Sequence, residues 1–254
     1  MNFENFYNDT YHDFYNACKN NNLISNIPIP YEIDASMPHA GSHTNGVIKI
    51  KDTFLRSHDD INRKRSLLYH EFTHYYDSEL FKHYGYKNSD IDTLMLTFSE
   101  IHASYNGTLA FFNCRNLSIK NKISTNRIVF ENQNLLEFCS KQIAYHISKM
   151  TNILGFKRSM YLLGEKRAIF QITKDIQKIY KIYTTKRIPS NIRDEIVKID
   201  SLININNYEC IDVQTLKTLK TKVEDTLRLY SMKNIPIPDL PGMDKVKKIL
   251  DSIT

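Results

Sequence analysis

Residues 70–74 read His-Glu-Phe-Thr-His, with two histidines four positions apart and a glutamate directly after the first. On an α-helix, residues four apart lie on one face, so His70 and His74 could both reach one metal ion. Glu71 follows His70 by about 100° around the helix, from where its carboxylate could reach the open position of that metal. This pattern is typical of zinc hydrolases, in which two histidines bind the metal and the glutamate takes a proton from the metal-bound water.

The residues around this pentapeptide predict a helix from Arg65 to Lys82, because the flanks contain no glycine or proline. Its apolar side chains project onto one broad side and would form a core face: Leu68, Tyr69, Phe72, Tyr76 and Leu80. His70, His74 and Asp77 project onto a different stripe. The histidines are therefore separated from the predicted core face, which favours metal ligands over two ordinary helix histidines.

A zinc site needs a third protein ligand. The extended form of the motif has a histidine at position 80, where this chain has Leu80, and the metzincin form also has a glycine at position 77, where it has Asp77. His83 would lie on the opposite side of the helix. The remaining candidate is Glu100, within a second predicted helix from about Asp92 to Phe112.

The face of the second helix that carries Glu100 also carries small side chains. Ala103, Ser104 and Gly107 follow Glu100 by three, four and seven residues. Small residues there would let this helix approach the first one closely enough for the Glu100 carboxylate to reach the metal. The alternative is that Glu100 is one exposed glutamate among several.

The His-Glu-x-x-His motif, followed by a helix with Glu100 and small residues one turn later, resembles the gluzincin branch of zinc metallopeptidases. This resemblance implies that His70, His74 and Glu100 bind Zn²⁺ and that Glu71 is the general base. The run that starts at Glu100 is similar to the Glu-x-x-Ala stretch of ImmA/IrrE-like metallopeptidases. The position of Asp77, three residues after the second histidine, resembles the pattern of lethal-factor-like metallopeptidases. The resemblance covers about residues 45–112 and leaves the subfamily open.

Two supporting roles remain to be assigned. Where the thermolysin pattern has an aspartate four residues after the ligand glutamate, this chain has Ser104. Asp77 is instead a candidate for the carboxylate that orients a ligand histidine, with a solvated helix residue as the alternative. A donor should also stabilise the oxyanion of the tetrahedral intermediate. The sequence does not choose among five candidates: Tyr84, Tyr86, His102, Tyr105 and His146.

Upstream of the motif, residues 46–52 alternate apolar and polar side chains after a glycine, which predicts a β-strand. By the resemblance, this would be the edge strand that holds substrate in extended form through main-chain pairing. A plain sheet strand is the alternative. Residues 27–43 contain prolines and glycine and predict a loop, with a short extended piece around residues 31–33. His39 and His43 would be polar loop residues.

The composition is that of a soluble globular protein: 254 residues, 41% hydrophobic and 24% charged. We expect a predominantly α-helical α+β fold. A zincin-like catalytic portion with a small sheet would span residues 1–114, a connection residues 115–134, and a helical bundle packed on the catalytic portion residues 135–254. The four cysteines are far apart and predict reduced thiols.

The N-terminus carries no secretory signal, and no apolar run is long enough to span a membrane. We therefore expect a cytoplasmic protein without a membrane partner, although signal-independent export remains open. From residue 151 onward, 19 lysines and arginines stand against 12 aspartates and glutamates, a net charge of +7, while the first 150 residues carry −1. No nucleic-acid-binding fingerprint accompanies this excess, so a solvated basic face is favoured over nucleic acid as a partner.

These observations predict a zinc-dependent metalloendopeptidase that hydrolyses a peptide or protein substrate. Two alternatives remain. One is a regulatory or toxin-like protease dedicated to a single protein, with the helical half as its recognition module. The other is a non-enzymatic mobile-element factor that binds nucleic acid through the basic helices.

Overall fold

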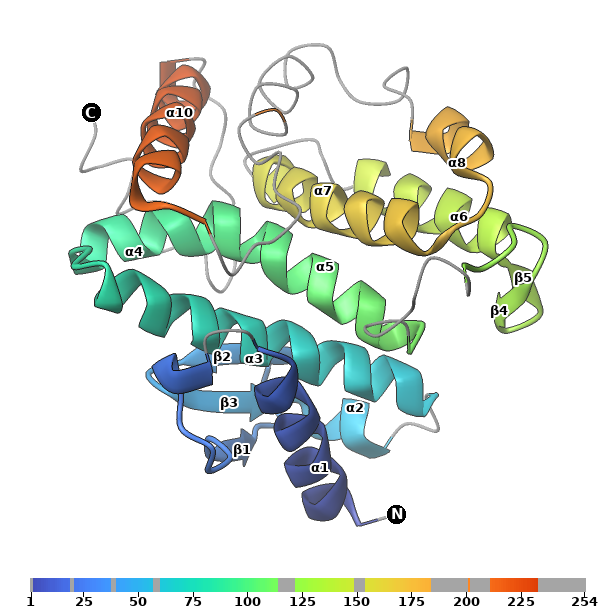
Figure 1. Ribbon diagram of the computed structural model, residues 1–254, viewed down its shortest axis with the longest axis horizontal. Coiled ribbons are helices and arrows are strands. Elements are labelled where there is room, and N and C mark those ends of the chain that lie inside the picture. Colours follow the sequence, from blue (N-terminus) through green and yellow to red (C-terminus); the bar gives the residue numbers. More distant parts are fainter. Residues whose placement is uncertain are drawn as a thin grey trace.

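The helix with the His-Glu-x-x-His motif runs through the middle of the molecule. In the computed structural model, this helix is α3 (Ile61–His83), with the sheet and α1 (Phe3–Ala17) on one side and α5 (Glu100–Phe111) on the other (Figure 1). The structure describes residues 2–18, 21–37, 40–56, 60–113, 122–148, 154–183, 201 and 211–232. Most of these residues are helical, with a small sheet, which confirms the predicted α-rich α+β class.

Helix α3 is buried on two sides. The predicted core face is confirmed, since Leu68, Tyr69, Phe72, Tyr76 and Leu80 are all buried. On this side the Phe72 ring packs between aromatic rings of α1, at 5.1 Å from Tyr11 and 5.3 Å from Tyr7 between centroids. The helix begins four residues earlier than predicted, where the Asp60 side chain accepts a hydrogen bond from the backbone of Asn62.

The sheet contains β1 (Tyr31–Ile33), β2 (Gly41–Thr44) and β3 (Val47–Ile50) in the order β1-β3-β2. Strand β3 is parallel to β1 and antiparallel to β2. The predicted strand therefore exists as β3. It is central, with β1 and β2 at the two edges of the sheet, so it is the plain sheet strand and not the edge strand.

The chain before β3 becomes a strand because of a two-residue turn. Asn45 and Gly46 have φ angles of 52° and 77°, as a type I′ hairpin turn requires. This turn folds β2 back onto β3, so residues 41–43, which were predicted to be loop, belong to a strand. His43 accordingly lies in β2, and His39 is outside the described residues.

The second predicted helix is divided into three parts. Helix α4 (Asn88–Leu94) passes into a π-helical turn, Met95–Ser99, and then into α5 without leaving the helical run. The predicted connection contains a small hairpin of β4 (Ile128–Phe130) and β5 (Gln133–Asn134).

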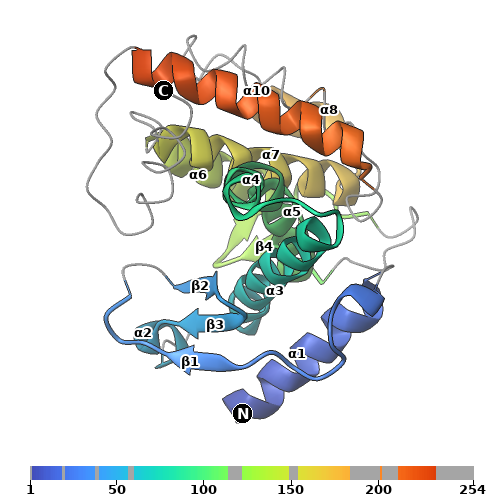
Figure 2. The ribbon, with the colours of Figure 1, turned by 90° about the vertical axis from the view of Figure 1, so that its left-hand side faces the viewer.

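The later helices are α6 (Leu135–Ser148), α7 (Leu154–Ile172), α8 (Ile176–Tyr183) and α10 (Val213–Met232), and Figure 2 shows them stacked on the far side of α5 from the sheet. Among them, α7 packs along α5, α10 packs on α4, and α8 packs on α6 and α7. The larger hydrophobic core includes Phe72 of α3, Ile101 of α5, Met160 of α7 and Leu216 of α10. Helices from both halves of the chain therefore share one core. Within the predicted bundle, residues 149–153, 184–200, 202–210 and 233–254 lie outside the described part of the chain.

The start of α10 is fixed to the turn between α3 and α4. The Tyr84 hydroxyl donates to the carbonyl of Ile211, and the Tyr86 hydroxyl donates to the carbonyl of Val213. Lys220 of α10 also pairs with Asp90 of α4 at 3.0 Å. These contacts hold α10 against α4 and the turn that precedes it.

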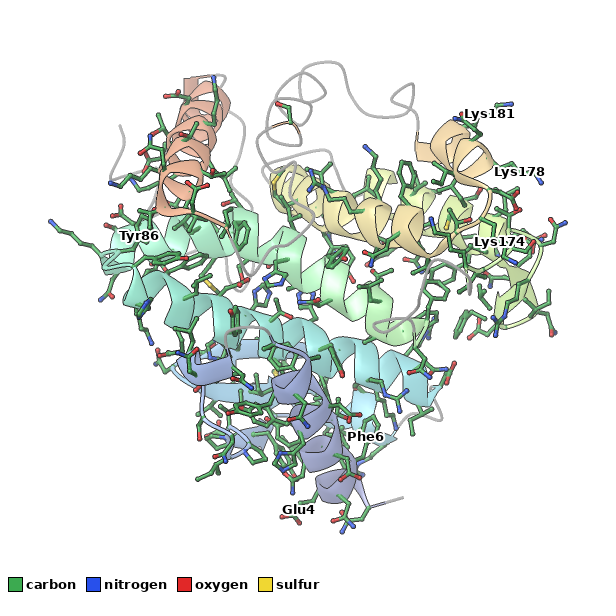
Figure 3. The ribbon with its side chains drawn as sticks, viewed as in Figure 1. Glu4, Phe6, Tyr86, Lys174, Lys178 and Lys181 are labelled. Carbon is green, nitrogen blue, oxygen red and sulfur yellow. The ribbon has the colours of Figure 1, made fainter. Side chains whose placement is uncertain are left out.

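Three lysines on α8 and just before it point outward into solvent. Lys174, Lys178 and Lys181 are all exposed and extend away from the body of the molecule in Figure 3. Cys18 and Cys139 are buried, and neither forms a disulfide within the described part of the chain. Among the described helices, none combines the length and the apolar character needed to cross a membrane.

Candidate metal centre

Three side chains from α3 and α5 converge on one point. The Nε2 atoms of His70 and His74 lie 3.1 Å apart. The carboxylate of Glu100 places Oε1 3.5 Å from His74 Nε2 and Oε2 3.9 Å from His70 Nε2. All three ligand atoms lie within 4.8 Å of one another. The structure thus brings together the three residues that were predicted to bind the metal.

These separations suit a tetrahedral cation. Ligand atoms at 2.0–2.1 Å from zinc are roughly 3.3 Å from each other in a tetrahedron, which is close to the distances between the His74, His70 and Glu100 atoms. Glu100 is 3% exposed and His74 is 7% exposed. A carboxylate buried against two imidazoles is costly unless a positive charge compensates it. A divalent cation held by these three residues would provide that charge.

Gly107 allows α5 to approach α3 so closely. A Cβ atom at this position would lie 3.0 Å from the carbonyl oxygen of Ser66 and 3.4 Å from the Cβ of His70. The predicted role of this glycine is therefore confirmed. Ser104 was predicted to share it, but this is wrong, because its hydroxyl donates to the carbonyl of Tyr161 on α7 at 2.6 Å.

Glycine also sets the distance between α5 and α7. A Cβ atom on Gly164 of α7 would lie 2.1 Å from the carbonyl oxygen of Ile101 and 2.8 Å from the Cβ of Ser104. Helix α5 is thus held between α3 and α7, with a glycine at each contact.

The consecutive residues Ser99 and Glu100 lie next to opposite nitrogen atoms of the His74 ring. Ser99 Oγ lies 2.7 Å from Nδ1, and Glu100 Oε1 lies 3.5 Å from Nε2. Ser99 ends the π-helical turn and Glu100 begins α5. A π-helical turn is often found at functional sites, where it changes the direction in which side chains project. Here it places a hydroxyl and a carboxylate around one imidazole.

Asp77 does not contact a ligand histidine directly. Its Oδ1 atom lies 2.8 Å from Nδ1 of His102, and both side chains are buried. Burial raises the pKa of the Asp77 carboxyl, while His102 and the hydroxyl of Ser99 oppose that rise. The carboxylate that was predicted to orient a ligand histidine therefore contacts His102 instead.

Glu71 lies against the edge strand β2. Its carboxylate is 4% exposed, and a Cβ atom on Gly41 would lie 3.1 Å from Glu71 Oε1. The carbonyl of Ala40 accepts a hydrogen bond from the backbone of Lys51 at 2.9 Å. Because hydrogen-bonded pairs alternate along an antiparallel ladder, Gly41 directs its N–H and C=O away from β3.

The predicted oxyanion donors are engaged elsewhere. Tyr84 and Tyr86 hold the start of α10, as described above, and the Tyr105 hydroxyl donates to Gln171. His102 contacts Asp77. The side chain of His146 is outside the described residues.

Tyr161 of α7 is a site residue that sequence reasoning missed. Its ring lies 5.6 Å from the ring of His70 between centroids. Burial raises the pKa of its phenol, and the neighbouring carboxylates of Glu165, Glu100 and Glu71 raise it further. The phenol therefore keeps its proton and can act as a hydrogen-bond donor beside Glu71 and Glu100. No motif marks this residue, which is separated from Glu100 by some 60 positions along the chain.

No protein-family model, curated protein or solved structure matches this chain. Its function must therefore be inferred from the chemistry and geometry of the residues around His70, His74 and Glu100.

Proposed function

We propose that this chain is a zinc-dependent metalloendopeptidase. This proposal rests on one observation: the metal-binding atoms of His70, His74 and Glu100 converge, with Glu71 beside them. Two imidazoles and one carboxylate are a ligand set that catalytic zinc uses in peptidases. When bound, Zn²⁺ would supply a Lewis acid that polarises the scissile carbonyl and makes water more acidic.

Glu71 serves as the general base in this proposal. It follows His70 on the helix and therefore projects to the side of the ligand histidines rather than toward the metal position itself. Its buried carboxylate takes a proton from the attacking water and passes it to the amine that leaves. The close contact with Gly41 places this proton transfer beside the edge strand.

Strand β2 is the surface that would hold the peptide. Gly41 turns its backbone polar groups outward from the sheet, next to the carboxylate of Glu71. An extended peptide could add to this edge by main-chain pairing, which positions its scissile bond without requiring a particular side chain. We therefore propose that residues 41–44, and not residues 46–52, pair with the main chain of the substrate.

Tyr161 is the proposed oxyanion donor. Its protonated phenol lies on the α7 side of His70, with the two rings 5.6 Å apart, and the carboxylates of Glu100 and Glu71 act on it electrostatically. A donor fixed at this position would stabilise negative charge as it develops on the carbonyl oxygen of the substrate. Because Tyr161 comes from the second half of the chain, the helical bundle would then contribute to catalysis.

The arrangement supports the resemblance to gluzincins. The motif lies on α3, the third ligand lies at the start of α5, and a small mixed sheet flanks the motif helix. On this basis we propose a zincin-like fold for the catalytic portion and a peptide or protein as substrate.

Wild type and a Glu71→Gln variant provide the test. Both proteins are purified with zinc, their metal content is measured, and cleavage of a mixed peptide library is followed by mass spectrometry. We expect zinc in both proteins and cleavage by wild type alone. Cleavage that persists in the variant would contradict the general-base assignment. A zinc-loaded wild type that leaves the library intact would support the alternative of a protease dedicated to one protein.

A further inference from the structure

Two buried polar contacts join α3 to α5 beside the candidate metal centre. Nδ1 of His102 lies 2.8 Å from Oδ1 of Asp77, and Nδ2 of Asn106 donates to Oγ1 of Thr73 at 3.1 Å. Thr73 and Asp77 are fully buried, while His102 is 2% and Asn106 is 5% exposed. Neither contact includes a metal ligand or the general base, so the proposed chemistry does not explain them.

The two contacts are successive rungs of one polar ladder between the helices. Asp77 follows Thr73 by four residues on α3, and His102 precedes Asn106 by four residues on α5. Residues four apart lie on one face of a helix, about one turn from each other. The two helices therefore run antiparallel here, and each rung pairs one polar side chain of α3 with one of α5.

The rung between Thr73 and Asn106 has a fixed polarity. The Thr73 hydroxyl donates its proton to the carbonyl of Tyr69 at 2.7 Å. The hydroxyl oxygen then serves as an acceptor, and the amide of Asn106 supplies the donor. A buried amide without such a partner would cost the free energy of its desolvation.

The positions one turn beyond the ladder carry buried aromatic or aliphatic side chains. They are Tyr69 and Phe81 on α3, and Phe98 and Ala110 on α5. A slip of α5 by one turn in either direction would set two of the four polar side chains opposite these residues. Buried polar groups without partners are costly, so the ladder favours a single register, as a buried polar pair does in a coiled coil.

Glycine alone would not fix this register. A Cβ atom on Gly107, next to Asn106, would lie 3.0 Å from the carbonyl oxygen of Ser66. A glycine permits close approach but has no side chain that interlocks with α3. We infer that the polar ladder holds α5 in the one register that presents Glu100 to the two ligand histidines.

The position of Glu100 is sensitive to this register. Its carboxylate oxygens lie 3.5 Å from Nε2 of His74 and 3.9 Å from Nε2 of His70. A slip of one turn moves a residue by about 5.4 Å along the helix, which would carry the carboxylate away from the histidines. The inference rests on the metal site of the proposed function. The ladder residues are positioning residues, because they act on the site through Glu100.

A double variant separates register from stability. In Thr73→Val/Asn106→Leu, one rung is replaced by apolar side chains of similar shape, a change that is close to neutral for stability. The urea midpoint of the full-length, metal-free protein should therefore stay near that of wild type. The Kd for zinc, measured by competition with a chelator, should rise roughly two- to tenfold, the effect of about one buried hydrogen bond on an equilibrium. Affinity falls because zinc binds only the fraction of molecules with α5 in register.

Single variants provide the controls. Thr73→Ser keeps the hydroxyl and should keep wild-type zinc affinity. Ser104→Ala removes a buried hydrogen bond from α5 to α7 and should lower the urea midpoint with zinc affinity unchanged. Wild-type zinc affinity in the double variant, or an equal loss of affinity in Ser104→Ala, would overturn the inference but leave the metal site intact. Undiminished zinc binding in His70→Ala would instead overturn the metal site.

Discussion

The ring of Tyr161 on α7 lies 5.6 Å from the ring of His70 on α3, so the second half of the chain reaches the candidate metal centre. We predict that Tyr161→Phe keeps zinc and fold but lowers kcat by roughly 10²–10³, because one oxyanion donor contributes about that much. KM should change little. Tyr105→Phe is the matched control, since its hydroxyl bonds Gln171 rather than the site. Equal kcat values for the two variants would remove Tyr161 from the mechanism.

Gly164 should be intolerant of even a methyl group. In an exposed helix, Gly→Ala normally stabilises by up to about 1 kcal/mol. At Gly164 the added Cβ would lie 2.1 Å from the carbonyl oxygen of Ile101, so α7 would have to move away from α5. We expect Gly164→Ala to lower the free energy of unfolding by about 3 kcal/mol. Urea denaturation measures this change, and an unchanged or increased midpoint would show that the helices are less closely packed than described.

Removal of the metal should destabilise the fold. A ligand that binds only the folded state stabilises it by about 2.7 kcal/mol at a hundredfold excess over its Kd. Without the cation, the buried carboxylate of Glu100 would lose its compensating charge. We therefore expect a chelator to lower the Tm of the wild-type protein. The same chelator should leave the Tm of His74→Ala unchanged, and an equal shift in both proteins would indicate an effect unrelated to this site.

Local patterns predicted part of the site. The spacing of His70, Glu71 and His74 predicts that they share one helix. The periodicity around Glu100 predicts a second helix. The edge strand could also have been found, because the Asn45–Gly46 dipeptide is a strong hairpin signal that places residues 41–44 beside β3. That signal was outweighed by the nearby proline and glycine, which favoured a loop.

Other parts depend on contacts that are distant in the sequence. Tyr161 reaches His70 only because Gly164 lets α7 pack against α5, and a single glycine in a helix does not reveal its partner. Similarly, Ser99 meets His74 because a π-helical turn precedes Glu100. The periodicity of side chains predicts an ordinary α-helix there.

Zinc content tests the central claim most directly. Wild type, Glu100→Gln and the control Glu4→Gln, an exposed glutamate near the N-terminus (Figure 3), are dialysed against a small excess of zinc and then against metal-free buffer. Elemental analysis of wild type and Glu4→Gln should give a single zinc ion per chain, whereas Glu100→Gln should lose most of its metal. A wild-type protein without zinc, or a Glu100→Gln variant that keeps as much zinc as wild type, would contradict the account.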